Sequence, residues 1–275
     1  MAIKLETIQA ALTDRYDVLR AIGKGNMCLV FEARDRSRGD HVAVKVLRPE
    51  FAVTVLNDRF HREIQILSQL DHPNILPLIE SSESGNFLYF VMPLAHGGSL
   101  RDRLNDEKRL DVQQALSITR DVAAALDYAH EHNVVHRDIK PENMMFDADR
   151  AMICDFGVAR AIVRAGGEHL SSSGLIVGTP TYMSPEQASA ESEIDHRSDV
   201  YSLGCVVYEM LAGEPPFSGR TAQAVLARHI GERPPSLRVV RPDISEHIEI
   251  AVRRALAKKA EERWGSGGAL VAALT

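Results

Sequence analysis

The chain has 275 residues, and 45% of them are hydrophobic, so it can bury a substantial core. Its formal net charge is -6, and it contains no long block of lysine or arginine, which argues against a nucleic-acid-binding surface and a polybasic membrane anchor. The 3 cysteines are widely spaced and form no CxxC pair, as suits a reducing cytoplasm. Glu6 stands where a signal peptide would need an uninterrupted apolar stretch, and no segment reaches about 18 apolar residues without a charge, so we expect neither a signal peptide nor a membrane span.

Strand-like and helical runs occupy different parts of the chain. The short apolar runs between about Tyr16 and Met92 are strand-like, whereas helical patterns dominate from about Ser99 onward. The proline and glycines of MPLAHGGSL lie between these parts and disfavour helix and strand interiors, so they suit a short hinge. We therefore expect a single domain, 1–275, made of a lobe at 1–92, a hinge at 93–98 and a lobe at 99–275.

Three helical patterns can be placed. In NDRFHREIQILSQL, residues 57–70, Asn57 suits the N-cap and apolar side chains fall at helical spacing, with Glu63 near the edge of the buried stripe. Residues 112–132 and 198–213 have the length and periodicity of core helices. The second of these is apolar enough to be central.

The segment AIGKGNMCLVFEARD, residues 21–35, puts Gly23 and Gly25 in a turn between two strand-like runs. Glycines there let backbone N–H groups approach phosphate oxygens, because no Cβ is in the way. A lone GxG also occurs in ordinary hairpins. A strand follows it rather than a helix, which argues against a dinucleotide-binding βαβ unit, and the segment is not a Walker loop.

Side chains alternate along the strand-like run HVAVKVL. Lys45 then shares a face with Ala43, while Val42, Val44 and Val46 point to the other face. We therefore expect one apolar face and one face on which a lysine points toward a cleft.

The octapeptide HRDIKPEN, residues 136–143, carries three basic and two acidic side chains around a proline. This composition suits neither a helix interior nor a strand interior, so we expect a loop that holds charge. By itself such a segment is also compatible with a solvated turn between a helix and a strand.

Taken in order, GKG, VAVKVL, Glu63, HRDIKPEN and the triplet Asp155, Phe156 and Gly157 resemble the motifs of a eukaryotic-like (Hanks-type) serine/threonine protein kinase catalytic domain. Phrases such as HPNILPL and YMSPEQAS are most similar to the bacterial branch. The resemblance implies an α+β fold of two lobes: an antiparallel sheet with one main helix, then a mainly α-helical lobe, with ATP in the cleft. The implied activity is transfer of the γ-phosphoryl group of ATP to serine and threonine hydroxyls of proteins.

The same resemblance assigns roles to charged residues. Because the transferred phosphoryl group carries dispersed negative charge, catalysis depends on positioning and electrostatic stabilisation, and the metal, Mg²⁺ or Mn²⁺, takes hard oxygen ligands. The implied catalytic residues are Asp138, Lys140, Lys45 and Glu63, and the implied metal ligands are Asn143 and Asp155. The alternative for Lys45 and Glu63 is a surface ion pair, which contributes little stability.

Residues of both lobes would surround ATP in a kinase of this kind. Met92 resembles the gatekeeper, and Pro93 is acceptable after it because the family uses only a carbonyl there. Cys28 stands at the third glycine position and should stiffen the loop. The implied ATP-binding residues are Ile22, Gly23, Lys24, Gly25, Val30, Ala43, Lys45, Met92, Pro93, Ala95 and Met145.

The resemblance also implies regulation by activation-segment phosphorylation between Asp155 and Glu186. Arg137 would meet a phosphate there, and Ser171 and Ser173 are preferred over Ser172 as acceptors. Among the structural residues, Thr181 and Tyr182 would form walls of the substrate pocket, Glu186 would pair with Arg263, and Asp199 would brace the catalytic loop.

Other functions are open at this point. A pseudokinase scaffold would usually lack Lys45, Asp138 or Asp155, and none is missing. A small-molecule kinase and an interaction role for the amphipathic N-terminus are further alternatives. Protein substrates are the expected partners, an N-lobe homodimer is a further expectation because bacterial relatives can pair in this way, and the chain could be the cytoplasmic part of a longer, membrane-tethered protein.

Overall fold

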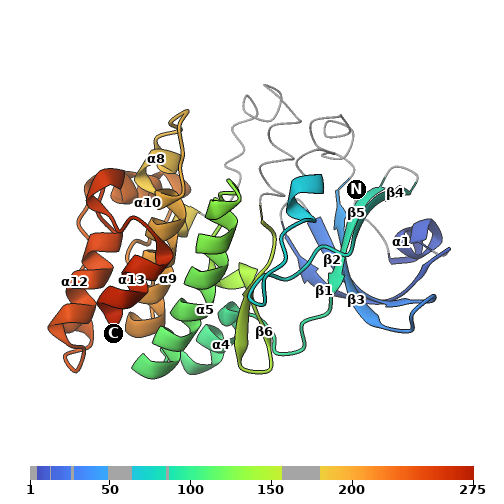
Figure 1. Ribbon diagram of the computed structural model, residues 1–275, viewed down its shortest axis with the longest axis horizontal. Coiled ribbons are helices and arrows are strands. Elements are labelled where there is room, and N and C mark those ends of the chain that lie inside the picture. Colours follow the sequence, from blue (N-terminus) through green and yellow to red (C-terminus); the bar gives the residue numbers. More distant parts are fainter. Residues whose placement is uncertain (1–4, 13, 26–27, 49–63, 85–86, 157–179) are drawn as a thin grey trace. The chain divides into compact units, whose positions relative to one another are not determined.

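The computed structural model describes residues 5–12, 14–25, 28–48, 64–84, 87–156 and 180–275. Their contacts divide them into two compact units (Figure 1). The first unit holds the described residues up to Asp71 together with Leu76–His96, and the second holds His72–Ile75 and the described residues from Gly97 onward.

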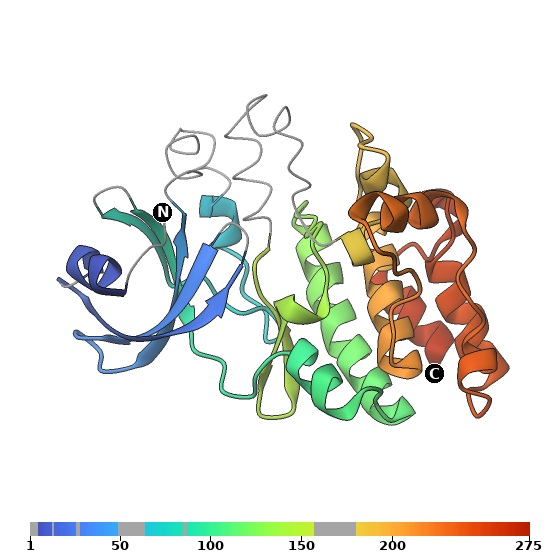
Figure 2. The ribbon, with the colours of Figure 1, turned by 180° about the vertical axis from the view of Figure 1, so that it is seen from behind.

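The first unit is built on a five-stranded antiparallel sheet with the strand order β1-β2-β3-β5-β4. A helix near the N-terminus lies beside this sheet in both ribbon views (Figures 1 and 2). The elements are α1 (Leu5–Leu12), β1 (Tyr16–Lys24), β2 (Cys28–Asp35), β3 (His41–Leu47), β4 (Glu80–Ser84) and β5 (Phe87–Pro93).

The core of this unit lies on the sheet face that α1 covers. Ile8 and Leu12 of α1 are buried together with Val42, Val44 and Val46 of β3. The predicted alternation of β3 is therefore confirmed, because the three valines enter one core and the residues between them do not. The apolar side of α1 packs in the chain's own core, so it is not available to bind a partner protein as considered above.

The second unit is mainly helical. Figure 2 shows its longer helices running roughly alongside one another. The elements are α4 (Leu100–Glu107), α5 (Val112–Glu131), η1 (Pro141–Asn143), β6 (Met144–Asp147), β7 (Arg150–Ile153), η2 (Pro180–Tyr182), α8 (Pro185–Ala188), α9 (Arg197–Ala212), α10 (Ala222–Gly231), α11 (Leu237–Val240), α12 (Glu246–Ala255), η3 (Ala260–Glu262) and α13 (Gly267–Leu274).

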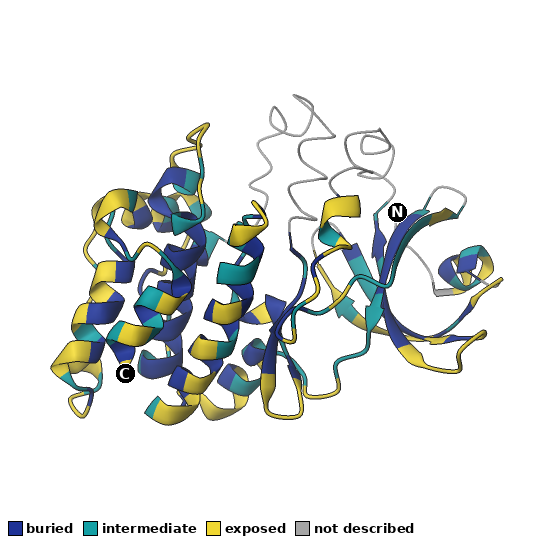
Figure 3. Cartoon of the chain, viewed as in Figure 1, coloured by how far each residue is buried: buried dark blue, intermediate teal, exposed yellow. Residues whose placement is uncertain are grey.

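Helix α9 is the centre of this unit. All its residues from Ser198 to Leu211 are buried, whereas the other helices of eight or more residues in this unit each keep an exposed side (Figure 3). A Cβ at Gly204 would lie 2.8 Å from the Cβ of Ala255, so glycine is what lets α9 and α12 approach closely. The helix ends at Gly213, whose φ of 89° lies in the left-handed region. The helices predicted at 112–132 and 198–213 are confirmed as α5 and α9.

For the predicted helix at 57–70 and for a membrane-spanning helix, the outcome covers only the described residues. The helix predicted at 57–70 falls largely outside the described residues, and only its part at 64–67 is seen as helix. Among the described residues, no helix combines the length and the apolar character needed to cross a bilayer.

Candidate functional site

The carboxylate of Asp138 lies in the loop between α5 and η1, beside a cation and an amide. Its Oδ2 accepts hydrogen bonds from Lys140 Nζ at 2.6 Å and from Asn143 Nδ2 at 3.1 Å. Among the described residues both contacts fall on Oδ2, which leaves Oδ1 for another donor. The Asp138 side chain is 25% exposed, so a donor from outside the loop can approach it.

The backbone of this loop is held by a carboxylate from α9. Asp199 is fully buried, and its two oxygens accept the N–H groups of His136 at 2.8 Å and of Arg137 at 2.7 Å. Nε2 of His130 lies 2.8 Å from the same side chain. Arg137 has a φ of 69°, a left-handed conformation that costs a non-glycine residue energy, and the bonds to Asp199 hold it there.

The ring of His136 has a structural place in the loop. Its Nε2 lies 3.0 Å from the carbonyl oxygen of Cys154 and must donate, because that oxygen can only accept. Its Nδ1 accepts the N–H of Asp138 at 3.2 Å, and the ring packs edge-on against Phe156. Both ring nitrogens are therefore engaged in holding the loop.

The two predicted metal ligands lie at the same end of the β6–β7 hairpin. Met144 pairs with Ile153, and beyond that pair the N–H of Cys154 donates to the carbonyl of Asn143 at 3.0 Å. Asp155 is the next residue, with a φ of 67°. The amide nitrogen of Asn143 faces Asp138, so its Oδ1 is directed elsewhere and offers a hard oxygen.

This donor set fits a metal ion that is also bound by phosphate. Mg²⁺ takes one or two protein oxygens and completes its shell with phosphate oxygens and water. Among the described residues, no group of three His, Cys, Asp or Glu side chains gathers as a protein-only metal site. Asn143 and Asp155 have the oxygen chemistry of such a shared site.

The sheet of the first unit carries four of the predicted nucleotide-binding side chains on one face. Lys45 of β3 pairs with Val30 of β2 and with Phe90 of β5, and Ala43 pairs with Met92. Directly paired residues of neighbouring antiparallel strands project from the same face. Val30, Ala43, Lys45 and Met92 therefore share the face opposite the valine core.

The glycines lie where β1 turns into β2. The N–H of Gly25 donates to the carbonyl of Cys28 at 2.9 Å, so this donor closes the turn. A Cβ on Gly23 would lie 3.3 Å from the Cβ of Val30, which leaves little room for any larger residue. Ile22 and Lys24 on either side of Gly23 are exposed.

The other predicted ATP-binding residues divide between the units. Pro93 ends β5 in register with Val42, and Ala95 follows in the first unit. Met145 belongs to the second unit, where it pairs with Met152 in the β6–β7 hairpin. Glu63, Ser171 and Ser173 lie outside the described residues, so their predicted roles remain predictions.

The family of this chain follows from a match to a family model. The family model described as protein kinase domain matches residues 16–272. The chain belongs to the protein kinase family. The predicted family is thereby confirmed, and the antiparallel sheet and the helical unit are those of the kinase fold.

Several bacterial kinases are among the curated relatives of this chain. It is 41% identical over 261 residues to serine/threonine-protein kinase PknB of Mycobacterium leprae, covering 92% of this chain and 41% of that protein. It is 36% identical over 261 residues to the probable serine/threonine-protein kinase SCO3848 of Streptomyces coelicolor, covering 93% of this chain and 38% of that protein. The chain thus spans about two fifths of the length of such relatives.

A solved structure has the same fold. The crystal structure of Rad53 1-466 in complex with AMP-PNP superposes with a TM-score of 0.78 at 26% sequence identity. The match covers 94% of this chain and 65% of the other. The two-lobed kinase fold expected from the sequence is therefore confirmed.

One cluster in the kinase joins four elements around an arginine. Arg101 of α4 donates to Glu142 Oε1 at 2.8 Å, to Glu209 Oε1 at 2.8 Å and to the hydroxyl of Tyr182. Tyr182 in turn donates to Glu209. Burial and the Glu209 carboxylate raise the pKa of Tyr182, so its hydroxyl keeps its proton. Arg101 thereby links the catalytic loop to η2.

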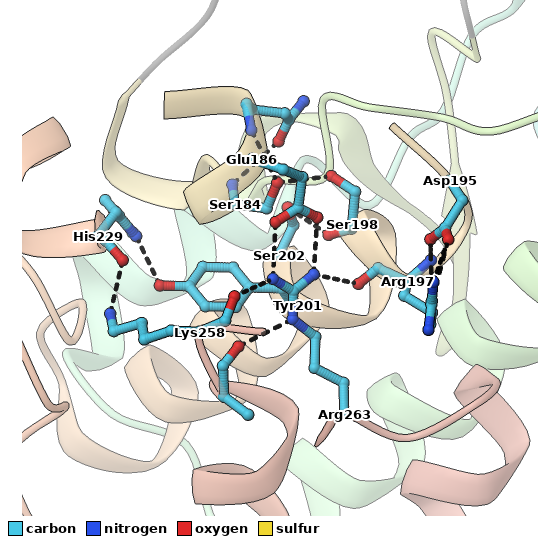
Figure 4. Close-up of polar contacts among 12 residues, drawn as sticks. Ser184, Glu186, Asp195, Arg197, Ser198, Tyr201, Ser202, His229, Lys258 and Arg263 are labelled. Carbon is cyan, nitrogen blue, oxygen red and sulfur yellow. Dashed lines mark hydrogen bonds and ion pairs between the residues drawn. The ribbon is translucent and has the colours of Figure 1, made fainter. Parts of the chain in front are cut away.

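A second cluster ties α8 to the segment between η3 and α13 (Figure 4). Glu186 and Arg263 form a buried two-pronged ion pair, with both N–O distances 2.7 Å. Burial alone would raise the pKa of Glu186, but the Arg263 guanidinium outweighs it and holds that pKa below its ordinary value. The ion pair predicted from the family resemblance is present.

Arg101 and Glu209 were not among the residues predicted to have a role. Each carries a signal that could have found it. A cation in the first turn of a helix opposes the helix dipole, as Arg101 does in α4, and therefore calls for a carboxylate. Glu209 is a carboxylate in an otherwise apolar stretch of the central helix, where an unpaired charge would be costly.

Proposed function

We propose that this chain is an ATP-dependent serine/threonine protein kinase. The observation that carries the proposal is the carboxylate of Asp138, held on one oxygen by Lys140 and Asn143 within a loop fixed by Asp199. The names of the bacterial relatives support protein hydroxyls as the substrate.

The proposed reaction needs few covalent contributions from the protein. The serine or threonine oxygen of the substrate bonds to the γ-phosphorus while the bond from that phosphorus to the bridging oxygen of ATP breaks, and the electron pair leaves with ADP. The hydroxyl proton passes to Oδ1 of Asp138. Lys140, 2.6 Å from Oδ2, keeps the carboxylate oriented and adds positive charge beside the transferred group.

Asn143 Oδ1 and the Asp155 carboxylate would hold the divalent metal, Mg²⁺ or Mn²⁺. When bound, the metal neutralises phosphate charge. Lys45 would contact the α and β phosphates and pair with Glu63, and Val30, Ala43 and Met92 would contact the adenine.

Regulation forms a finer part of the proposal. Arg137 would receive a phosphate from the activation segment, with Ser171 and Ser173 as the acceptors. The guanidinium of Arg137 donates to the carbonyl of Ile194 at 2.8 Å, so the side chain already borders the segment that follows α8. Phosphorylation by the kinase itself would then join the activation segment to Arg137 through charge-assisted hydrogen bonds.

The activity is tested by incubating the chain with γ-labelled ATP and a basic protein substrate, with Mg²⁺ and then with Mn²⁺. Asp138→Asn keeps the size of the side chain but removes its charge, so we expect kcat to fall by about a thousandfold or more. Nucleotide binding should stay within about twofold, because Asp138 holds the hydroxyl substrate rather than ATP. Binding of ATP without transfer of label by the wild-type chain would favour a pseudokinase.

The regulatory sites need a separate experiment. Label should map to Ser171 or Ser173 and disappear in the Asp138→Asn chain. Ser171→Ala with Ser173→Ala should lower the activity, while Ser172→Ala serves as the matched control. Full activity of the double variant, or label on Ser172 alone, would contradict this assignment.

A further inference from the structure

A buried histidine lies between α9 and η2, outside the catalytic loop. His229 of α10 is fully buried. Its Nδ1 lies 2.9 Å from the hydroxyl of Tyr201 (Figure 4). Its Nε2 lies 3.0 Å from the carbonyl oxygen of Thr181. The imidazole therefore bridges α9 to the short helix η2 that precedes α8.

The direction of the two bonds follows from the chemistry of the partners. The Thr181 carbonyl can only accept, so Nε2 of His229 carries a hydrogen and donates it. Burial and the nearby Lys258 lower the pKa of His229 to about 4, so the ring is neutral near pH 7 and Nδ1 is an acceptor. Tyr201, whose own pKa is raised by burial, must then donate its hydroxyl hydrogen to Nδ1.

Rings and a cation fix the position of the imidazole. Phe217 packs edge-on at 4.8 Å between ring centroids and Tyr201 at 5.7 Å. Lys258 donates to the carbonyl of His229 at 2.7 Å, where a cation also suits the negative end of α10. The ring has little freedom to turn, so Nε2 is a fixed donor.

Helix η2 is held at two successive carbonyls. His229 donates to the carbonyl of Thr181, and Ser202 Oγ of α9 donates to the carbonyl of Tyr182 at 2.8 Å. The side chain of Tyr182 is linked through Arg101 to Glu142 of the catalytic loop. Displacement of η2 would therefore disturb this link to the catalytic loop at Glu142.

We propose that His229 is a positioning residue for the protein substrate, because its Nε2–H holds the Thr181 carbonyl and so fixes η2, a wall of the hydroxyl-substrate pocket. The inference rests on the proposed function, since η2 has that role only in a kinase that binds proteins. His229 touches neither ATP nor the reacting atoms, so it should affect peptide binding and leave nucleotide binding alone.

The kinetic test uses the full chain and a synthetic serine peptide that the wild-type chain phosphorylates. In His229→Leu the Thr181 carbonyl loses its donor, and we expect the KM for peptide to rise about tenfold, with kcat and the KM for ATP within about twofold. His229→Gln can present an amide N–H to the same carbonyl and should recover most of the loss. His247→Leu, at an exposed histidine of α12, is the matched control.

Two measurements test the anchor without any catalysis. Hydrogen exchange of the amides at 181–184 should quicken about tenfold in His229→Leu and stay near wild type in His229→Gln. The ¹⁵N spectrum of the wild-type ring, assigned by its loss in His229→Gln, should show the Nε2–H tautomer. Thermal melting of each variant identifies any that fails to fold, in which case the ring spectrum decides.

The outcomes are distinct. An Nδ1–H tautomer, unchanged exchange at 181–184, or a folded His229→Leu chain with unchanged peptide KM would each overturn the proposal. A parallel loss of ATP binding would make His229 a general structural residue instead. Absence of phosphoryl transfer by the wild-type chain would contradict the proposed function, and exchange would then decide on the anchor by itself.

Discussion

The sheet of the first unit and the catalytic loop of the second place their functional side chains by different means. In the sheet, Lys45 is set by the backbone ladder, which aligns it with Val30 and Phe90 on the neighbouring strands. In the loop, the backbone is set by a side chain distant in sequence, because Asp199 accepts the N–H groups of two consecutive residues.

This difference decides how function and stability are shared among residues. On β3 the residues alternate, so Val44 serves the core while Lys45 serves the other face, and either can change with little effect on the other. In the loop one residue does both, because a buried carboxylate that holds the backbone also holds Asp138 in place. Mutations should therefore separate the two properties in the sheet and combine them in the loop.

The largest combined effect is expected from Asp199→Asn. The amide has one acceptor oxygen for two backbone N–H groups and points a donor at one of them, so about 3–5 kcal/mol of unfolding free energy should be lost. Because the loop carrying Asp138 shifts, kcat should fall by about a hundredfold as well. Urea unfolding and steady-state kinetics on the same preparation measure both quantities.

Asp195→Asn is the matched control for that change. Asp195 is a carboxylate that pairs with Arg197, but its side chain is 46% exposed, so the loss should be about 0–1 kcal/mol with activity retained. If Asp199→Asn lowered only kcat or only stability, the two properties would be separable in the loop as they are in the sheet.

The next effect comes from pH. The pKa of His229 is about 4 in the fold and near 6.5 in the unfolded chain, so below pH 6.5 only the unfolded chain takes up this proton. Stability should therefore fall as the pH drops from 6.5 to 4, by about 3 kcal/mol from this one group. Comparison of wild type with His229→Gln isolates the term, and His247→Gln, at an exposed histidine, should leave the pH dependence unchanged.

The parts of the fold that the sequence predicts are those that depend on local patterns, as in the sheet, rather than on distant partners, as in the catalytic loop. The period-2 pattern of β3 and the apolar length of α5 and α9 are local properties, and they predicted the core face and the central helices. In the structure one of the two units ends at His96.

The supports of the site could not be predicted in the same way. Arg101 meets Glu209 across 108 positions of the chain, and His229 meets Thr181 across 48. No local period records such a pairing, and only the unfavourable placement of a charge hints that a partner exists. Asp199 and the Glu186–Arg263 pair were expected because the family resemblance supplied the long-range partner.

The smallest effect tests the sheet side of the contrast. Val44 is fully buried and Val44→Ala should cost about 2 kcal/mol, while kcat stays within about twofold because the nucleotide face is untouched. Val239→Ala is the matched control, since this valine is 80% exposed and should change stability by less than about 0.5 kcal/mol. Lys45→Met should have the opposite effect to Val44→Ala, because activity should be lost while the free energy of unfolding stays within about 0.5 kcal/mol of wild type. A loss of stability in Lys45→Met as large as that in Val44→Ala would mean that the two faces of β3 are not independent, and the separation of roles along the strand would then fail.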